Sequence, residues 1–128
     1  MQPTISKLFV LAGAVMGALA VGIGAFGAHA LKNLLQANNR LETFETASKY
    51  HFYHALALVL VGLLFAHGAP RWLNLSGHFF IWGIVIFSGS LYVLCLTNLR
   101  WLGAITPIGG VLLILGWCLL AYGILKGN

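Results

Sequence analysis

Hydrophobic residues form four long segments, and none of them contains Asp, Glu, Lys or Arg. They span about residues 8–28, 50–66, 78–97 and 102–125. Roughly 20 helical residues cross the ~30 Å hydrocarbon core of a bilayer, so each segment is close to the length of one crossing. The pattern predicts an all-α membrane protein whose four transmembrane helices form an antiparallel up-down bundle. A single four-helix transmembrane domain is expected to account for residues 1–128.

The connections between the segments are short, except for the first. Residues 30–49 are the most polar part of the chain and predict an interfacial stretch or a helical extension of the second crossing. Asn39, followed by Glu42 three residues later, is typical of a capping box and predicts that a helix begins there. Residues 97–101 alone separate the last two crossings, which are therefore expected to form an antiparallel hairpin.

Composition excludes a water-soluble protein. Hydrophobic residues make up 60% of the chain and charged residues 7%, whereas charged residues make up about 25% of soluble domains. The net charge of +5 is spread over connections and chain ends, which suits anionic lipid headgroups and not a nucleic-acid surface. We expect the partners to be the lipid bilayer and either a second copy of the chain or another membrane protein, and no nucleic acid.

Small residues recur along the helices at spacings that let two backbones approach closely. In lipid, such positions are the usual sites of helix association. Packing inside this bundle is the favoured interpretation, and dimerisation through the first helix is the alternative. The expected packing residues are Gly13, Gly17, Gly24, Gly27, Gly89, Pro107, Gly109 and Gly110.

Polar side chains concentrate in one half of the membrane. We call the side on which the chain begins side A and the opposite side B. Up-down connectivity brings most polar residues into the B half, and buried polar groups in a membrane are the best pointer to a site. The candidate polar site comprises His29, Tyr50, His54, Ser88, Ser90, Tyr92 and Thr106.

His54 is the most informative of these residues because it lies only about four residues, or roughly 6 Å, from the middle of its crossing. A charged imidazole is costly at that depth, so the ring must be neutral or well partnered. Its helical stripe consists of Phe44, Ala47, His51, His54 and Leu58. A proton relay, a metal or haem ligand and a contact to a partner subunit are possible roles. The favoured interpretation is a neutral ring hydrogen-bonded to Tyr92, Ser88 or a backbone carbonyl.

Four ordered motifs resemble one family. They are Gly24–Leu31, Ala47–Tyr50 with His54, Phe87–Tyr92 and Ile105–Gly110. With these motifs, the chain resembles the small four-span membrane proteins of the domain of unknown function 423 family, to which transmembrane protein 256 is similar. The resemblance covers essentially the whole length. It implies a multi-pass protein of the bacterial inner membrane, or of a related organelle membrane, with no established activity.

The residues that match the pattern of the family include both histidines of the candidate site. They are Gly24, Gly27, His29, Tyr50, His54, Ser88, Gly89, Ser90, Tyr92, Thr106, Pro107, Gly109 and Gly110. His51 lies outside this pattern, which disfavours a paired-histidine ligand. Lys and Arg number three on side A and four on side B, so they do not set the orientation. The resemblance implies that both termini face the cytoplasm.

Three functions remain open. The leading hypothesis is a non-enzymatic accessory or assembly protein, because the chain shows no activated nucleophile, no buried acid and no nucleotide or metal motif, and no cofactor is expected. The first alternative is a small permeation or transport protein with a polar cavity around His54. The second is a metal- or haem-binding redox protein that uses His29, His51 and His54.

Overall fold

Helices account for almost all of the chain in the computed structural model, which describes residues 3–127. The elements are α1 (Pro3–His29), α2 (Lys32–Ala37), α3 (Leu41–Leu64), the 3₁₀ turn η1 (Phe65–His67), α4 (Pro70–Thr97), the 3₁₀ turn η2 (Arg100–Ala104) and α5 (Thr106–Lys126). Four of these helical segments are long and apolar enough to span a membrane. The predicted class, an all-α protein with four transmembrane helices, is confirmed.

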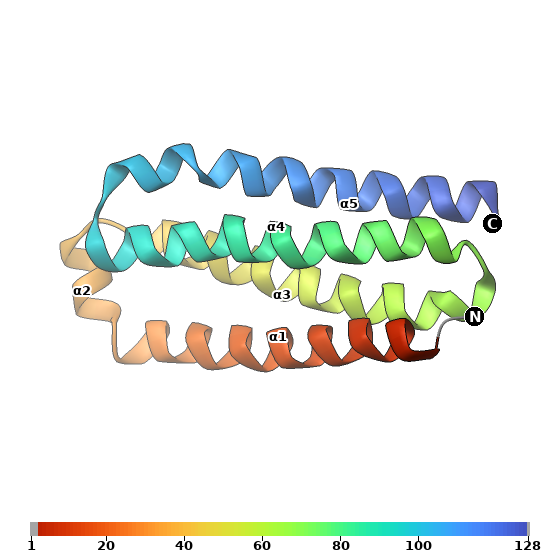
Figure 1. Ribbon diagram of the computed structural model, residues 1–128. Helices are drawn as coiled ribbons and strands as arrows, with labels where there is room; N and C mark the ends of the chain where they lie inside the picture. The colour runs from red at the N-terminus through yellow and green to blue at the C-terminus, as the bar shows by residue number, and fades with distance from the viewer. Residues whose placement is uncertain (1–2, 128) are drawn as a thin grey trace.

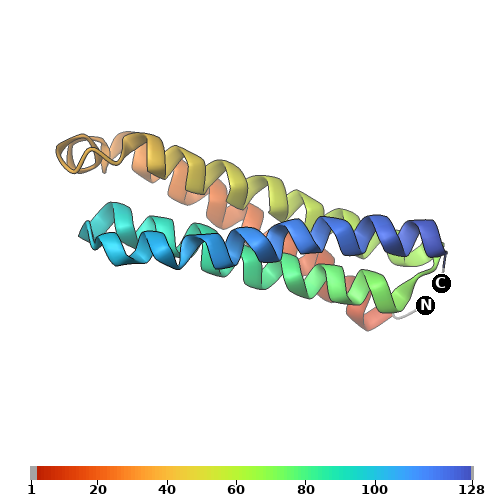
Figure 2. The same cartoon turned by 90° about the horizontal axis from the view of Figure 1, so that it is seen from above.

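Two central helices, α3 and α4, carry the outer helices on opposite sides (Figures 1 and 2). α1 packs mainly on α3, and α5 packs mainly on α4. Both chain ends and the α3–α4 connection lie at one end of the bundle, which we call end A (Figure 1). The α2 corner and the α4–α5 connection lie at the other end, end B.

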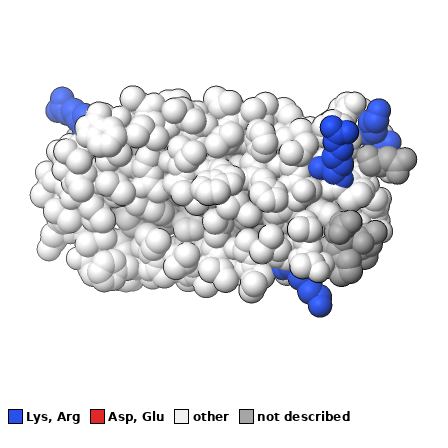
Figure 3. Space-filling model, viewed as in Figure 1, with Lys and Arg blue, Asp and Glu red and all other residues white. Residues whose placement is uncertain are grey.

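The main core fills the half of the bundle toward end A. Its largest fully buried side chains are those of Phe9, Leu58, Leu73 and Phe80. Most residues of α1 and α5 face outward instead. On the face shown in Figure 3, basic side chains lie toward the two ends and the middle is uncharged. An uncharged belt of this kind fits a hydrocarbon environment.

The α2 corner at end B corrects the predicted helix start. Asn39 adopts the left-handed conformation (φ 57°), and Arg40 occupies the N-cap of α3 without a side-chain capping bond. The predicted capping box of Asn39 and Glu42 is therefore wrong. Long-range hydrogen bonds fix the corner in its place, because Asn38 Nδ2 donates to the Cys95 carbonyl at 3.0 Å and Arg40 Nε donates to Asn98 Oδ1 at 3.0 Å.

The α4–α5 hairpin is longer than the sequence suggested, because η2 precedes α5. Pro107 lies in the first turn of α5, where its missing N–H removes no helical hydrogen bond. Deeper in the hairpin, a Cβ on Gly109 would overlap the backbone of Phe87. The absence of a side chain at Gly109 therefore sets the close approach of α4 and α5.

The other predicted packing glycines divide into three groups. Gly13 and Gly27 lie directly against α3, where a Cβ would overlap Val59 and Phe44 respectively. Gly24, Gly17 and Gly110 form the second group: a Cβ would lie 3.0 Å from Ser48 Oγ at Gly24, and 4.0 Å and 3.6 Å from the nearest atom at Gly17 and Gly110. Gly89 differs from the expectation, because a Cβ there would meet no heavy atom within 4 Å. Its motif neighbours face the bundle, whereas Gly89 faces outward.

Candidate functional site

The stripe predicted on the second crossing faces the interior of the bundle. Phe44, Ala47, His51, His54 and Leu58 are all at most 5% exposed. Because positions three and four apart share a face of an α-helix, the two imidazoles point into the same interior region from successive turns. We call His51 and His54, with Tyr50, Tyr92 and Trp117 around them, the histidine cluster.

His54 has a hydrogen-bond partner at each ring nitrogen. Its Nδ1 lies 2.7 Å from the carbonyl oxygen of Tyr50. Its Nε2 lies 2.9 Å from Nε1 of Trp117. The indole N–H can only donate, so Nε2 accepts and carries no proton. The proton must then reside on Nδ1, which donates to the Tyr50 carbonyl.

These two bonds describe a neutral imidazole in a single tautomer. Neutrality is what the depth of the residue demands, since an unpaired charge would be costly there. The rings of Tyr50, Phe80 and Trp117 surround His54 at centroid distances of 6.1, 5.6 and 5.8 Å. To act as a base or a metal ligand, the ring would first have to give up one of its hydrogen bonds.

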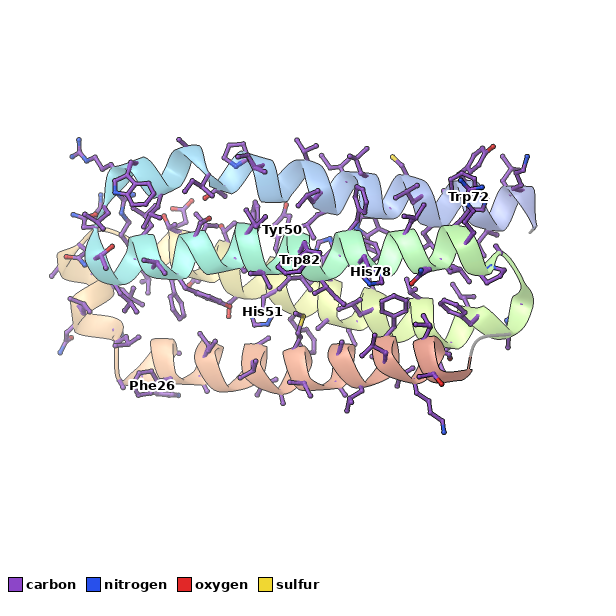
Figure 4. The ribbon with its side chains drawn as sticks, viewed as in Figure 1. Phe26, Tyr50, His51, Trp72, His78 and Trp82 are labelled. Atoms are coloured by element: carbon purple, nitrogen blue, oxygen red, sulfur yellow. The ribbon has the colours of Figure 1, made fainter. Side chains whose placement is uncertain are left out.

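Tyr92 pairs with His51 and not with His54. Its hydroxyl lies 2.9 Å from Nδ1 of His51, and the two rings meet edge to face at 5.8 Å. In Figure 4 the side chain of His51 points from α3 toward α1. Its bond to Tyr92 links α3 to α4.

Two members of the histidine cluster were not among the predicted site residues. His51 lay on the predicted stripe, but it fell outside the pattern of the family. Trp117 was expected to pack deep in its crossing against lipid or a neighbouring helix. Its N–H donates to His54, which is 63 residues away in the sequence and on another helix. Sequence spacing alone does not reveal such a bond.

Tyr50 contacts His54 with both its backbone carbonyl and its ring, although the side chain of Tyr50 is 42% exposed. The ring stacks on His54 with an interplanar angle of 21° and also touches Phe87 at 5.1 Å. Figure 4 labels Tyr50 beside α4, on the side of that helix toward α5. It thus covers the side of His54 that faces end B.

The predicted hydroxyl residues form a separate set of helix-to-helix bonds. Ser88 Oγ donates to the Ala47 carbonyl at 2.8 Å and joins α4 to α3. Ser90 Oγ lies 2.7 Å from Thr106 Oγ1 and joins α4 to the start of α5. Both hydroxyls of that pair also reach carbonyls of their own segments. The hydrogen bonds that these hydroxyls make within residues 3–127 include none to a ring of the histidine cluster.

Serine hydroxyls connect helices in the A half as well, where few polar residues were expected to matter. Ser6 Oγ donates to the Gly62 carbonyl and Ser76 Oγ donates to the Gly116 carbonyl, each at 2.7 Å. Together with Ser88, these bonds place one serine-to-carbonyl link in each of the contacts α1–α3, α4–α5 and α3–α4. In the links made by Ser6 and Ser76, the accepting carbonyl belongs to a glycine. These glycines are the sequence signal that could have revealed the two links.

His29 does not join the other predicted site residues. It is the last residue of α1 and is exposed at end B. Among residues 3–127, no group of three or more His, Cys, Asp or Glu side chains is placed to hold a metal ion. Cys95 and Cys118 are free thiols, the former buried and the latter exposed.

The sequence of this region matches a known family. Residues 23–110 match the family described as "Protein of unknown function (DUF423)". The chain belongs to the DUF423 family. The matched region runs from the end of α1 to the start of α5, so it contains all the predicted site residues and every member of the histidine cluster except Trp117.

Curated relatives extend the match over nearly the whole chain. The UPF0382 membrane protein of Staphylococcus saprophyticus is 48% identical over 120 residues, which cover 94% of this chain and 98% of the relative. The UPF0382 membrane protein YwdK of Bacillus subtilis is 41% identical over 121 residues, again 94% and 98% of the two chains. No solved structure matches. The chain is thus a multi-pass membrane protein of the DUF423 family, and it is similar to the UPF0382 membrane proteins.

Proposed function

We propose that this DUF423 protein is a non-enzymatic accessory or assembly protein that binds another membrane protein or a second copy of itself. One observation carries the proposal most directly: both nitrogens of the His54 imidazole are bonded within the chain. The deepest polar group thereby serves to join α3 to α5. Ser88 and Ser76 likewise use their hydroxyls to join neighbouring helices.

The outer faces of the bundle supply the surface that such a role requires. Large apolar side chains project outward from both outer helices, including Leu11 at 62% and Val15 at 52% exposure on α1, and Val111 at 54% and Ile114 at 63% on α5. In lipid, van der Waals complementarity and not hydrophobicity selects a partner helix. The proposal therefore assigns partner recognition to the shape of one of these faces.

Purification in a mild detergent tests the proposal. The full-length chain, tagged and extracted from its native membrane, should elute with a stoichiometric membrane protein or as a homo-oligomer of defined mass. Val15→Trp and Ile114→Trp add bulk to the α1 and the α5 face respectively, and one of them should abolish the association while the other serves as its control. The proposal would be refuted if the protein is a monomer without a partner and if deletion of its gene leaves all membrane complexes intact.

Permeation remains a second proposal, supported by a hollow at end B. It has a volume of about 760 Å³ and is lined mostly by polar residues of the α2 corner and the first turns of α3, among them Glu42 and Glu45. His54 lies deeper and is 5% exposed. Flux into liposomes tests this function. It is dismissed if the wild-type protein and His54→Ala give equal flux that is no greater than the flux into empty vesicles.

We also propose the bacterial inner membrane as the location, with both chain ends in the cytoplasm. The membrane proteins of Staphylococcus and Bacillus that resemble this chain support a bacterial membrane. Single cysteines introduced at Lys7 and at Arg100 in a cysteine-free background provide the test. In intact cells, an impermeant maleimide should label the cysteine at position 100 and not the one at position 7.

A further inference from the structure

An apolar groove runs between the outward faces of α4 and α5 near end A. Its volume is about 410 Å³, and it is lined by Trp72, Phe79, Leu115, Cys118, Leu119 and Tyr122. None of the residues that line the groove belongs to the histidine cluster. Figure 4 shows Trp72 beside the last turns of α5.

The end of the groove closest to end A is built by two aromatic rings. Trp72 and Tyr122 meet edge to face, with ring centroids 4.7 Å apart. The neighbouring Gly123 allows this contact, because a Cβ there would overlap the β-carbon of Trp72. Trp and Tyr favour the depth at which lipid headgroups meet acyl chains. This end of the groove thus has the chemistry of a headgroup boundary.

Two exposed basic residues stand beside that boundary. The guanidinium carbon of Arg71 lies 5.2 Å from the ring centroid of Trp72. Lys126 follows Tyr122 by four residues and so projects one turn further out on the same face of α5. The only two acidic residues of the sequence are Glu42 and Glu45, and both lie in the first turns of α3 at end B. No acidic side chain of the chain therefore neutralises these two cations.

We propose that this groove binds one acyl chain of an anionic phospholipid, whose phosphate is held by Arg71 and Lys126. From Tyr122 to Leu115 the groove follows α5 for about 10 Å at 1.5 Å per residue. That length is a large part of one ~15 Å leaflet, half of the hydrocarbon core. The apolar wall fits the chain, and the uncompensated positive charge selects a lipid with net negative charge.

Native mass spectrometry of the full-length protein tests the proposal. The protein is released from detergent after incubation with equal amounts of phosphatidylglycerol and phosphatidylcholine of identical acyl chains. Phosphatidylglycerol should be retained preferentially. The double variant Arg71→Gln/Lys126→Gln should lower that retention about 30-fold, and each single variant about fivefold. The single variants serve as the measurement if the double variant fails to fold.

Matched controls separate the groove from general electrostatics. Lys32→Gln/Arg100→Gln removes two charges at end B and should leave phosphatidylglycerol retention unchanged. Cys118→Trp fills the groove without altering any charge and should reduce retention, whereas Ile124→Trp, at an exposed position of the same helix that does not line the groove, should not. Circular dichroism melting verifies that each variant is folded.

Three results would overturn the proposal. Equal retention of both lipids by the wild-type protein would show that charge does not select the occupant. Equal losses in the two double variants would show that the basic residues act through total charge alone. A dimer that disappears in Cys118→Trp, without any bound lipid, would show that a second copy of the chain occupies the groove.

Discussion

The indole N–H of Trp117 donates to Nε2 of His54 across 2.9 Å, and this bond joins α3 and α5, two helices that otherwise approach each other little. Trp117→Phe keeps an aromatic ring but leaves the acceptor nitrogen unpaired. We expect the free energy of unfolding to fall by about 1 kcal/mol. Reversible unfolding in mixtures of SDS and a mild detergent measures this change.

Trp82→Phe is the matched control for that substitution. Trp82 also lies in a crossing, but it is 56% exposed and faces outward. Its replacement should change the stability by less than about 0.5 kcal/mol. ¹⁵N spectra of labelled histidine give an independent readout, since His54 should carry its proton on Nδ1 in the wild-type protein. An Nε2-protonated ring would contradict the bond.

A double-mutant cycle tests the pairing of His51 and Tyr92, which lie 2.9 Å apart through Nδ1 and the phenol oxygen. His51→Phe and Tyr92→Phe each preserve ring size and remove one polar group. We expect a coupling free energy of about 0.5–1 kcal/mol, the range of hydrogen bonds between membrane helices. Strictly additive effects in the unfolding titration would show that the two side chains do not interact.

Gly109 of α5 and Gly89 of α4 should respond in opposite directions to alanine. Gly109→Ala places a Cβ against the Phe87 backbone, so the helices must move apart at a cost of about 1–3 kcal/mol. Gly89→Ala meets open space and should stabilise the helix by about 0.5–1 kcal/mol. Thermal unfolding in detergent compares the two variants. Equal effects would mean that the helices are not in contact at Gly109.

Ser88→Ala removes the bond between the Ser88 hydroxyl and the Ala47 carbonyl, which links α4 to α3. The loss of this buried bond should destabilise the protein by about 1 kcal/mol. Thr97→Ala removes a hydroxyl of α4 that donates at an exposed position to Val93 of its own helix, and it should be neutral within about 0.5 kcal/mol. Accelerated hydrogen exchange in α3 and α4 of Ser88→Ala alone would support the link. Identical exchange in the two variants would argue against it.

The sequence predicted the crossings because the hydrocarbon core dictates both their length and their polarity. It also identified the buried stripe that contains His51 and His54, since helical periodicity fixes which residues share a face. The start of α3 was predicted incorrectly. Asn39 is left-handed there, so its side chain does not cap the helix, and long-range bonds from Asn38 and Arg40 hold the corner instead.

The pattern predicted only part of the surroundings of His54. The ring was expected to bond to Tyr92, Ser88 or a backbone carbonyl; it bonds to the Tyr50 carbonyl, and its second partner is Trp117. The choice depends on the rotation of α4 and α5 about their axes. That rotation is set by close contacts such as Gly109 against Phe87, which depend on three-dimensional packing and leave no regular spacing in the sequence.

The bond between His54 and Trp117 also constrains the order of events during synthesis. Ribosomes make proteins from the N-terminus, at about 5–20 residues per second, so the imidazole is made 63 residues before its indole donor. Until α5 is inserted, Nε2 has to find a temporary partner, such as water or a translocon group. The nascent bundle therefore completes its interior only when the last crossing arrives.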